Sequence, residues 1–188
     1  MYGHYDGLIF DMDGTILDTE PTHRKAWQTV LARYGLTFDE RTVVGLNGSP
    51  SWRIAEVIIA SHQSDLDPVA LAQEKTTALK AMQFDTVRPL PLIEVVKAWK
   101  GKRPMAVGTG SEHAMAEALL QHLGLRDCFD AIVGADDVTR HKPEPETFLR
   151  CAELLKVEPA RCVVFEDADF GIQAAKAAGM DFVDVRLL

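Results

Sequence analysis

The chain has 188 residues, of which 47% are hydrophobic and 26% are charged, the balance of an ordinary soluble globular protein. This length allows one α/β core with a modest insertion. The formal net charge of −8 argues against nucleic acid and anionic membrane surfaces as partners, because both would repel it. The sequence shows no signal-peptide pattern, no apolar run of membrane-spanning length, and three cysteines without metal-ligand spacing, so we expect reduced thiols and a cytoplasmic location.

The first predicted strand runs directly into two aspartates. Leu8, Ile9 and Phe10 form a short apolar run, which indicates a buried strand of a parallel sheet. If the strand continues to Asp13, the side chains of Asp11 and Asp13 point to the same side. Two like charges at that distance require a cation or a shared proton. The alternative is a surface turn in which both aspartates cap backbone amides.

The next part of the chain is predicted to be entirely helical. Apolar residues recur at helical spacing, Gly35 is a natural helix end, and Ser49 followed by Pro50 is a favourable helix start. No convincing strand is found between residues 18 and 84. The predicted helices span residues 19–34 and 39–44, a stretch that begins at Pro50, and residues 67–84.

Strands and helices alternate after a proline-rich linker at residues 88–91. Right-handed crossovers place such strands in one parallel sheet. The fold class is therefore α/β, a Rossmann-like parallel-sheet core made of residues 1–17 and 85–188, with a helical cap of residues 18–84 inserted after the first strand. The predicted strands are 104–109, 131–133, 162–165 and 182–185, and the predicted helices are 92–99, 111–124, 145–156 and one that ends at Gly179.

Polar groups follow three of the predicted strands, and ligands of such sheets bind at the carboxyl ends of the strands. Gly108-Thr109-Gly110-Ser111 opens a helix with Ser111 as its expected cap, which suits an anion. Lys142 stands in a loop stiffened by two prolines. Glu166 and Asp167 end a strand with two acids, and carboxylates together with a substrate phosphate commonly hold Mg²⁺.

These stretches together resemble the haloacid dehalogenase-like superfamily, over the whole chain and in the family's order. The helical insert and Asp18-Thr19-Glu20 resemble the β-phosphoglucomutase-like branch, and within it the bacterial phosphatases of fructose 1-phosphate and 6-phosphogluconate. The four family motifs correspond to Asp11-Met12-Asp13-Gly14-Thr15, Thr109, Lys142 and Glu166-Asp167.

The resemblance implies a role for each core residue. Asp11 would be the nucleophile and would form an aspartyl-phosphate, and Asp13 would be the general acid and then the general base. Mg²⁺ would be held by Asp11, Asp167 and the backbone carbonyl of Asp13, with Glu166 behind them. The phosphoryl oxygens would be bound by Thr109, Lys142 and the amides of Met12, Asp13 and Gly110.

The cap is expected to determine which substrate is used. His23, Arg53 and Lys75 are its candidate specificity residues, and the alternative for each is a charge on a solvated helix face. β-Phosphoglucomutases have an arginine just after the glycine of the cap loop. This sequence reads Gly48-Ser49-Pro50-Ser51-Trp52 there, which leaves the second phosphate of a mutase without its clamp.

The function predicted from the sequence is a Mg²⁺-dependent phosphatase of small sugar phosphates, a monomer that binds neither nucleic acid nor membranes. A β-phosphoglucomutase is the alternative within the family. Two further alternatives are a receiver-type signalling domain that carries a phospho-aspartate and a non-catalytic sugar-phosphate sensor. The helical insert argues against a receiver domain, because such a switch must expose its site to a donor protein.

Overall fold

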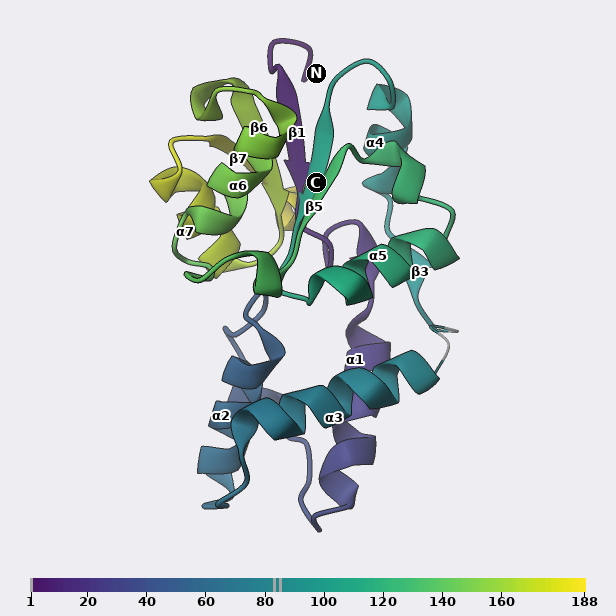
Figure 1. Ribbon diagram of the computed structural model, residues 1–188, viewed down its shortest axis with the longest axis vertical. Coiled ribbons are helices and arrows are strands. Elements are labelled where there is room, and N and C mark those ends of the chain that lie inside the picture. The colour runs from purple at the N-terminus through teal and green to yellow at the C-terminus, as the bar shows by residue number, and fades with distance from the viewer. Residues whose placement is uncertain (1, 83, 85) are drawn as a thin grey trace.

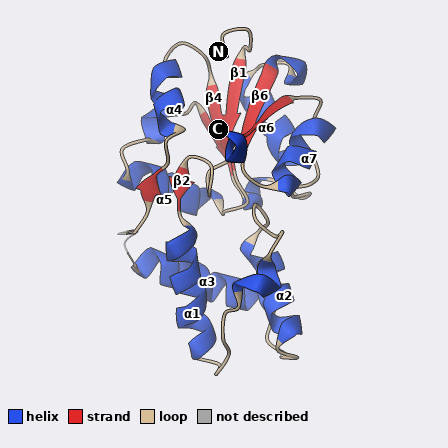
Figure 2. Cartoon of the chain, turned by 180° about the vertical axis from the view of Figure 1, so that it is seen from behind, coloured by secondary structure: helices blue, strands red, loops and turns tan. Residues whose placement is uncertain are grey.

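The computed structural model describes residues 2–82, 84 and 86–188. Its centre is a sheet of five parallel strands, which confirms the predicted α/β class (Figures 1 and 2). Strand β1 lies in the middle of the sheet and pairs with β4 on one side and β6 on the other. The strand order is β5 (Ala131–Val133), β4 (Met105–Gly108), β1 (Gly7–Phe10), β6 (Cys162–Glu166) and β7 (Asp181–Asp184).

The alternation of side chains along β1 explains why both faces of the sheet are covered. Leu8 and Phe10 belong to a hydrophobic cluster on one face, and Ile9 belongs to a second cluster on the other face. Helices α4 (Ile93–Trp99) and α5 (His113–His122) cover the first face, whereas α6 (Glu146–Leu155) and α7 (Asp169–Ala177) cover the second (Figure 1). A parallel sheet with both faces buried requires such apolar strands.

Three helices form a separate layer at the carboxyl end of the sheet, in the place of the predicted cap. Helix α3 (Pro68–Ala81) packs against both α1 (Glu20–Ala32) and α2 (Ser51–Ser61), as Figure 1 shows. The Asp67 side chain accepts a hydrogen bond from the Ala70 amide at 2.7 Å and so caps α3. The expected start of α2 was wrong by one residue, because Pro50 is the capping residue and no side chain caps this helix.

The linker predicted at residues 88–91 is wrong in part, because two of its residues form a strand. β2 (Leu17–Asp18) and β3 (Arg88–Pro89) pair antiparallel, with Leu17 opposite Pro89 and Asp18 opposite Arg88. Neither strand was predicted, since two residues are too few for a period-two pattern and proline argues against a strand. The two crossings between core and cap therefore lie side by side. The predicted domain boundary at residue 85 lies outside the described residues.

Five short 3₁₀ helices complete the described structure: η1 (Glu40–Val43), η2 (Arg126–Cys128), η3 (Ala135–Asp137), η4 (Pro159–Arg161) and η5 (Val185–Leu187). The first of them is the predicted helix at residues 39–44. Among the described helices, none combines the length and the apolar character that crossing a membrane would need.

Candidate active site

The groups predicted to carry chemistry lie where the central strands end. Asp11 follows β1 directly, and its amide donates to the Phe165 carbonyl on β6 at 3.0 Å. Thr109 follows β4, and Glu166 is the last residue of β6. Because β4 and β6 flank β1, the sheet order itself brings these side chains to one edge. The first strand ends at Phe10, so Asp13 lies beyond it.

Lys142 connects the two acids at the centre of the site. Its ammonium donates to Asp11 Oδ1 at 2.7 Å and to Glu166 Oε2 at 2.8 Å, and all three side chains are buried. Burial alone would lower the pKa of Lys142, but the charges of Asp11 and Glu166 outweigh burial and raise it. The Lys142 side chain is therefore a fixed positive charge beside Asp11.

The acids near Lys142 form a group suited to a metal ion. Oxygen atoms of Asp11, Glu166 and Asp167 lie within 4.8 Å of one another. Burial, followed by the charge of Glu166, raises the pKa of Asp11 to about 7, and burial followed by the charge of Asp11 raises the pKa of Asp167 to about 6. Three carboxylates against one ammonium leave excess negative charge, which a divalent cation would neutralise. The residues present therefore fit Mg²⁺.

The hydrogen bonds of Glu166 distinguish it from the other two acids. One of its oxygens binds Lys142, and the other accepts from the amides of Asp167 at 3.1 Å and Ala168 at 3.0 Å. Asp167 is oriented by Thr15 at 3.0 Å. A Cβ atom on Gly14 would lie 2.4 Å from Asp167 Oδ2, so only glycine fits there, and its φ of +83° favours glycine as well.

Asp13 faces a different set of partners, although it lies two residues from Asp11. Its carboxylate accepts hydrogen bonds from the hydroxyls of Thr19 at 2.6 Å, Ser111 at 2.9 Å and Thr109 at 3.2 Å. His23 Nε2 lies 3.1 Å from Asp13 Oδ1. Although burial acts to raise it, these hydrogen bonds hold the pKa of Asp13 well below its usual range. The two aspartates thus differ in their surroundings and in the direction in which their pKa values are shifted.

A chain of contacts leads from Asp13 into the cap. The Lys75 ammonium lies 2.7 Å from His23 Nδ1 and 3.2 Å from Ser51 Oγ. An ammonium group can only donate, so Nδ1 accepts and the proton of a neutral His23 lies on Nε2, directed at Asp13. Burial, followed by the charge of Lys75, lowers the pKa of His23, which agrees with the neutral form.

Backbone amides complete the phosphate-binding part that the resemblance implied. The N–H groups of Met12, Asp13 and Gly110 donate to no acceptor among the described residues. Together with Lys142 they offer donors to an anion at this edge of the sheet. Thr109 contacts Asp13 and accepts a hydrogen bond from the Ser111 amide at 3.0 Å.

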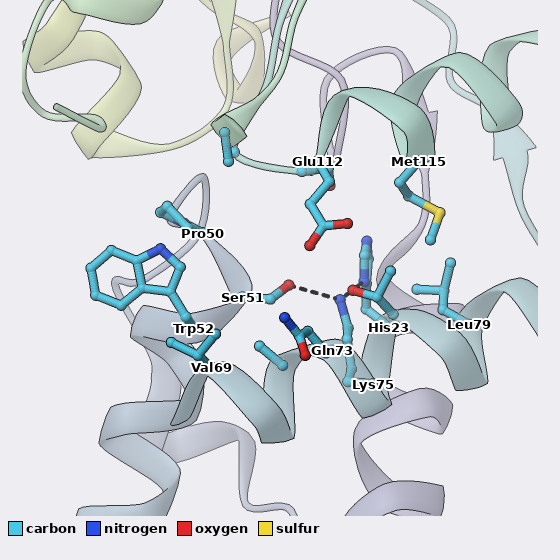
Figure 3. Close-up of a pocket in the computed structure, with 15 residues that line it drawn as sticks. His23, Pro50, Ser51, Trp52, Val69, Gln73, Lys75, Leu79, Glu112 and Met115 are labelled. Atoms are coloured by element: carbon cyan, nitrogen blue, oxygen red, sulfur yellow. Dashed lines mark hydrogen bonds between the residues drawn. The ribbon is translucent and has the colours of Figure 1, made fainter. Parts of the chain in front are cut away.

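The cap candidates do not all reach the site. His23 and Lys75 line a cavity of about 90 Å³ between cap and core, and Figure 3 shows their side chains beside each other. Arg53 does not line this cavity. Its guanidinium stacks over the Trp52 ring at 5.6 Å and contacts the Lys142 carbonyl at 3.4 Å. The structure therefore places Arg53 between α2 and the loop of Lys142.

Two further hydroxyls near Asp13 were not predicted to belong to the site. Ser111 was expected to cap α5, but the helix begins after Glu112 and the Ser111 hydroxyl binds Asp13 instead. Thr19 was part of a family-like stretch and received no function. The sequence feature that could have indicated Thr19 is its position just after Asp18, where the chain enters the cap.

Comparisons with known proteins agree with this geometry. A family model described as a haloacid dehalogenase-like hydrolase matches residues 5–179. The chain is 69% identical to the fructose-1-phosphate phosphatase YqaB of Escherichia coli (strain K12) over 188 residues, which is 100% of both chains.

Two solved structures of the same fold are also similar. CbbY of Rhodobacter sphaeroides in complex with phosphate is 29% identical, with a TM-score of 0.84 over 95% of this chain and 84% of that one. The β-phosphoglucomutase of Clostridium difficile is 29% identical, with a TM-score of 0.81 over 95% and 83%. The chain belongs to the haloacid dehalogenase-like hydrolase family, as its motifs indicated.

Proposed function

We propose that this enzyme is a Mg²⁺-dependent phosphatase that hydrolyses small sugar phosphates of the fructose 1-phosphate or 6-phosphogluconate type. The observation that carries the proposal is the separation of Asp11 from Asp13. One aspartate is buried beside a lysine and two further acids, and the other is held by hydroxyls and by His23, which lines the cap cavity. The similarity to a fructose-1-phosphate phosphatase supports the same substrate class.

The proposed reaction has two steps. In the first, a carboxylate oxygen of Asp11 attacks phosphorus, the bond between phosphorus and the sugar oxygen breaks, and Asp13 gives its proton to that oxygen. In the second, Asp13 takes a proton from water, the water oxygen attacks phosphorus, and the bond to Asp11 breaks. The proton that Asp13 takes from water in the second step restores the acid for the next first step. His23 Nε2, which lies 3.1 Å from Asp13 Oδ1, helps to hold this carboxyl in place.

Charge neutralisation is the main task of the remaining groups. When bound by Asp11, Asp167 and the backbone carbonyl of Asp13, Mg²⁺ would supply positive charge to the phosphoryl oxygens. Lys142 adds a second positive charge, and the free amides of Met12 and Gly110 add directed donors. Glu166 keeps Lys142 and the loop of Asp167 in place.

A turnover screen tests the proposal. Phosphate release would be measured for fructose 1-phosphate, 6-phosphogluconate and unrelated phosphate esters, first in EDTA and then with added Mg²⁺. We expect release from sugar phosphates that stops in EDTA and returns with Mg²⁺. Full activity in EDTA, or release from none of the sugar phosphates, would contradict the proposal.

A β-phosphoglucomutase is the second candidate, favoured by the similarity to solved structures of that enzyme. The cap loop argues against it, since Ser51 rather than an arginine lines the cavity after Gly48. NMR of a reaction with β-glucose 1-phosphate separates the two candidates. Free phosphate is the expected product, and glucose 6-phosphate in stoichiometric amount would identify a mutase.

The proposed substrate class fits the predicted location of the protein in the cytoplasm. Cys128, Cys151 and Cys162 are buried free thiols, as expected for a protein of the cytoplasm, where small sugar phosphates are metabolised. Location in the cytoplasm is part of this proposal and would be checked by cell fractionation.

A further inference from the structure

We propose that Glu112 makes this enzyme disfavour sugar phosphates that carry a second phosphate. The inference rests on the proposed function, because it concerns the part of the same substrate that enters the cap cavity. It assigns a specificity role to a core residue, in addition to the cap residues His23 and Lys75.

Glu112 reaches the cavity from the side opposite the cap. It immediately follows Ser111, the residue whose hydroxyl binds Asp13, and precedes the first residue of α5. Figure 3 shows its carboxylate pointing away from the core, into the space above Gln73 and Lys75. A substrate whose leaving oxygen lies at Asp13 would therefore place its next atoms beside Glu112.

Helix capping does not explain why a carboxylate stands at this position. Glu112 is the capping residue of α5, but its side chain makes no capping hydrogen bond, and glutamate is not among the favoured capping residues. Glu112 is exposed, and no hydrogen bond or close ion pair reaches its carboxylate within the described part of the chain, although its charge acts on the Lys75 ammonium. Its oxygens are free to accept hydrogen bonds from sugar hydroxyls.

The charges around the cavity leave little to balance a second phosphate. Lys75 is the one lysine or arginine among the described residues that line it, and its ammonium already contacts His23 and Ser51. His23 is neutral at this position, as argued above from its contact with Lys75. A second phosphate would thus meet the Glu112 carboxylate without a free cation beside it, and like charges repel. A remainder without a second phosphate avoids this repulsion, and its hydroxyls can bind the polar side chains of the lining.

Fructose 1-phosphate and fructose 1,6-bisphosphate form a matched pair for the test, because they differ in the second phosphate alone. The kcat/KM for cleavage at carbon 1 would be measured for both, with the products identified by NMR. The variants are Glu112→Gln, which removes the charge, and Glu112→Lys, which reverses it. Glu56→Gln is the control, since Glu56 is exposed on α2, lies outside the cavity and carries the same charge.

We expect wild-type enzyme to prefer the monophosphate, and Glu112→Gln to narrow this preference by about tenfold, which corresponds to about 1.4 kcal/mol. The change should come from a higher kcat/KM for the bisphosphate, through a lower KM. Glu112→Lys should narrow the preference for the monophosphate further. The Glu56→Gln ratio should equal that of the wild type. Unchanged ratios in both Glu112 variants would overturn the inference and leave the proposed phosphatase intact, whereas a wild type inactive on both sugars would contradict the proposed function itself.

Discussion

At the scale of single residues, the site contains two aspartates that the sequence places two positions apart and the structure gives different partners. Asp11 lies beside Lys142, and Asp13 lies beside His23, Thr19 and Ser111. This difference in partners supports a nucleophile and an acid–base group, rather than two equivalent metal ligands. It also makes the two roles separable by substitution.

Replacing each aspartate by asparagine should give two distinct defects. Asp11→Asn should abolish turnover and covalent phosphate, because the amide is not a nucleophile. Asp13→Asn should lower steady-state turnover by about 10²–10⁴-fold, the usual contribution of a general acid or base, yet still form phosphoenzyme from an ester with a good leaving group. Rapid-quench measurement of bound phosphate distinguishes them. Substantial activity in Asp11→Asn, with its fold confirmed by circular dichroism, would exclude the mechanism.

Deprotonation of Lys75 should make kcat/KM for sugar phosphates fall at alkaline pH. Burial lowers the pKa of Lys75 to about 8, so above that pH the ammonium that fixes His23 is lost and kcat/KM for sugar phosphates should fall. The unfolded chain binds more protons than the folded one between about pH 8 and the lysine model value of 10.5, so this group makes the free energy of unfolding rise with pH there. Deprotonation of Lys75 therefore does not itself destabilise the fold in this range.

The pH prediction has a direct control. Lys75→Met should remove the fall in kcat/KM above about pH 8 and leave a lower activity that does not change with pH there. Lys80→Met, an exposed lysine on the same helix, should keep the wild-type profile. A fall that persists in Lys75→Met would assign the titration to another group.

At the scale of elements, helix α7 is shaped around the buried Glu166. A Cβ atom on Gly171 would lie 1.8 Å from Glu166 Oε2 and 2.0 Å from its Cδ, and that carboxylate cannot move away without breaking its bond to Lys142. Helix propensity favours alanine over glycine by about 1 kcal/mol, whereas overpacking a buried site costs about 1–3 kcal/mol. The cost of overpacking should therefore exceed the gain in helix propensity.

Gly171→Ala should lower the free energy of unfolding and weaken Mg²⁺ activation together. Urea denaturation and a Mg²⁺ titration of activity measure the two effects. Gln173→Ala is the control, because Gln173 is exposed on the same helix and should change stability by less than about 0.5 kcal/mol. A Gly171→Ala protein more stable than wild type would show that propensity decides the outcome.

The elements also show how far a sequence can be interpreted. The core strands β1, β4, β5 and β6 could be predicted because each is a buried apolar run with turn signals around it. The fifth strand, β7, is exposed or half-buried, and the alternation of strands and helices indicated it instead. The β2–β3 pair could not be predicted, since its stability comes from residues far apart in sequence that give no local pattern. Ser111 was assigned a local capping role, but a tertiary contact with Asp13 takes its hydroxyl. Arg53 was predicted as a specificity residue, and the structure places its guanidinium over the Trp52 ring and outside the cavity lining, a contact that the sequence pattern did not predict.

At the scale of the whole molecule, the acids of the site lower the stability of the metal-free fold. Three carboxylates lie together and are balanced by Lys142 alone. Mg²⁺ that binds the folded protein should raise its stability by about 2.7 kcal/mol at a hundredfold excess over Kd. Thermal unfolding with EDTA and with Mg²⁺ measures this, and Asp167→Asn should abolish most of the difference. An equal Mg²⁺ effect in that variant would place the ion elsewhere.

The pairing of β2 with β3 has a consequence for how this architecture could be divided. Asp18 and Arg88 are partners at the end of an antiparallel ladder, so the whole cap occupies the position of a hairpin loop. A two-residue turn such as Asn-Gly joins paired strands of this kind. The cap is thus an enlarged turn of a hairpin, and the chain could exchange it for a short turn without altering the order of the five core strands. Such a capless form would keep Asp11, Lys142 and Glu166 in one unit and lose His23 and Lys75, so it would retain the groups for phosphate chemistry without the contribution of the cap to substrate selection.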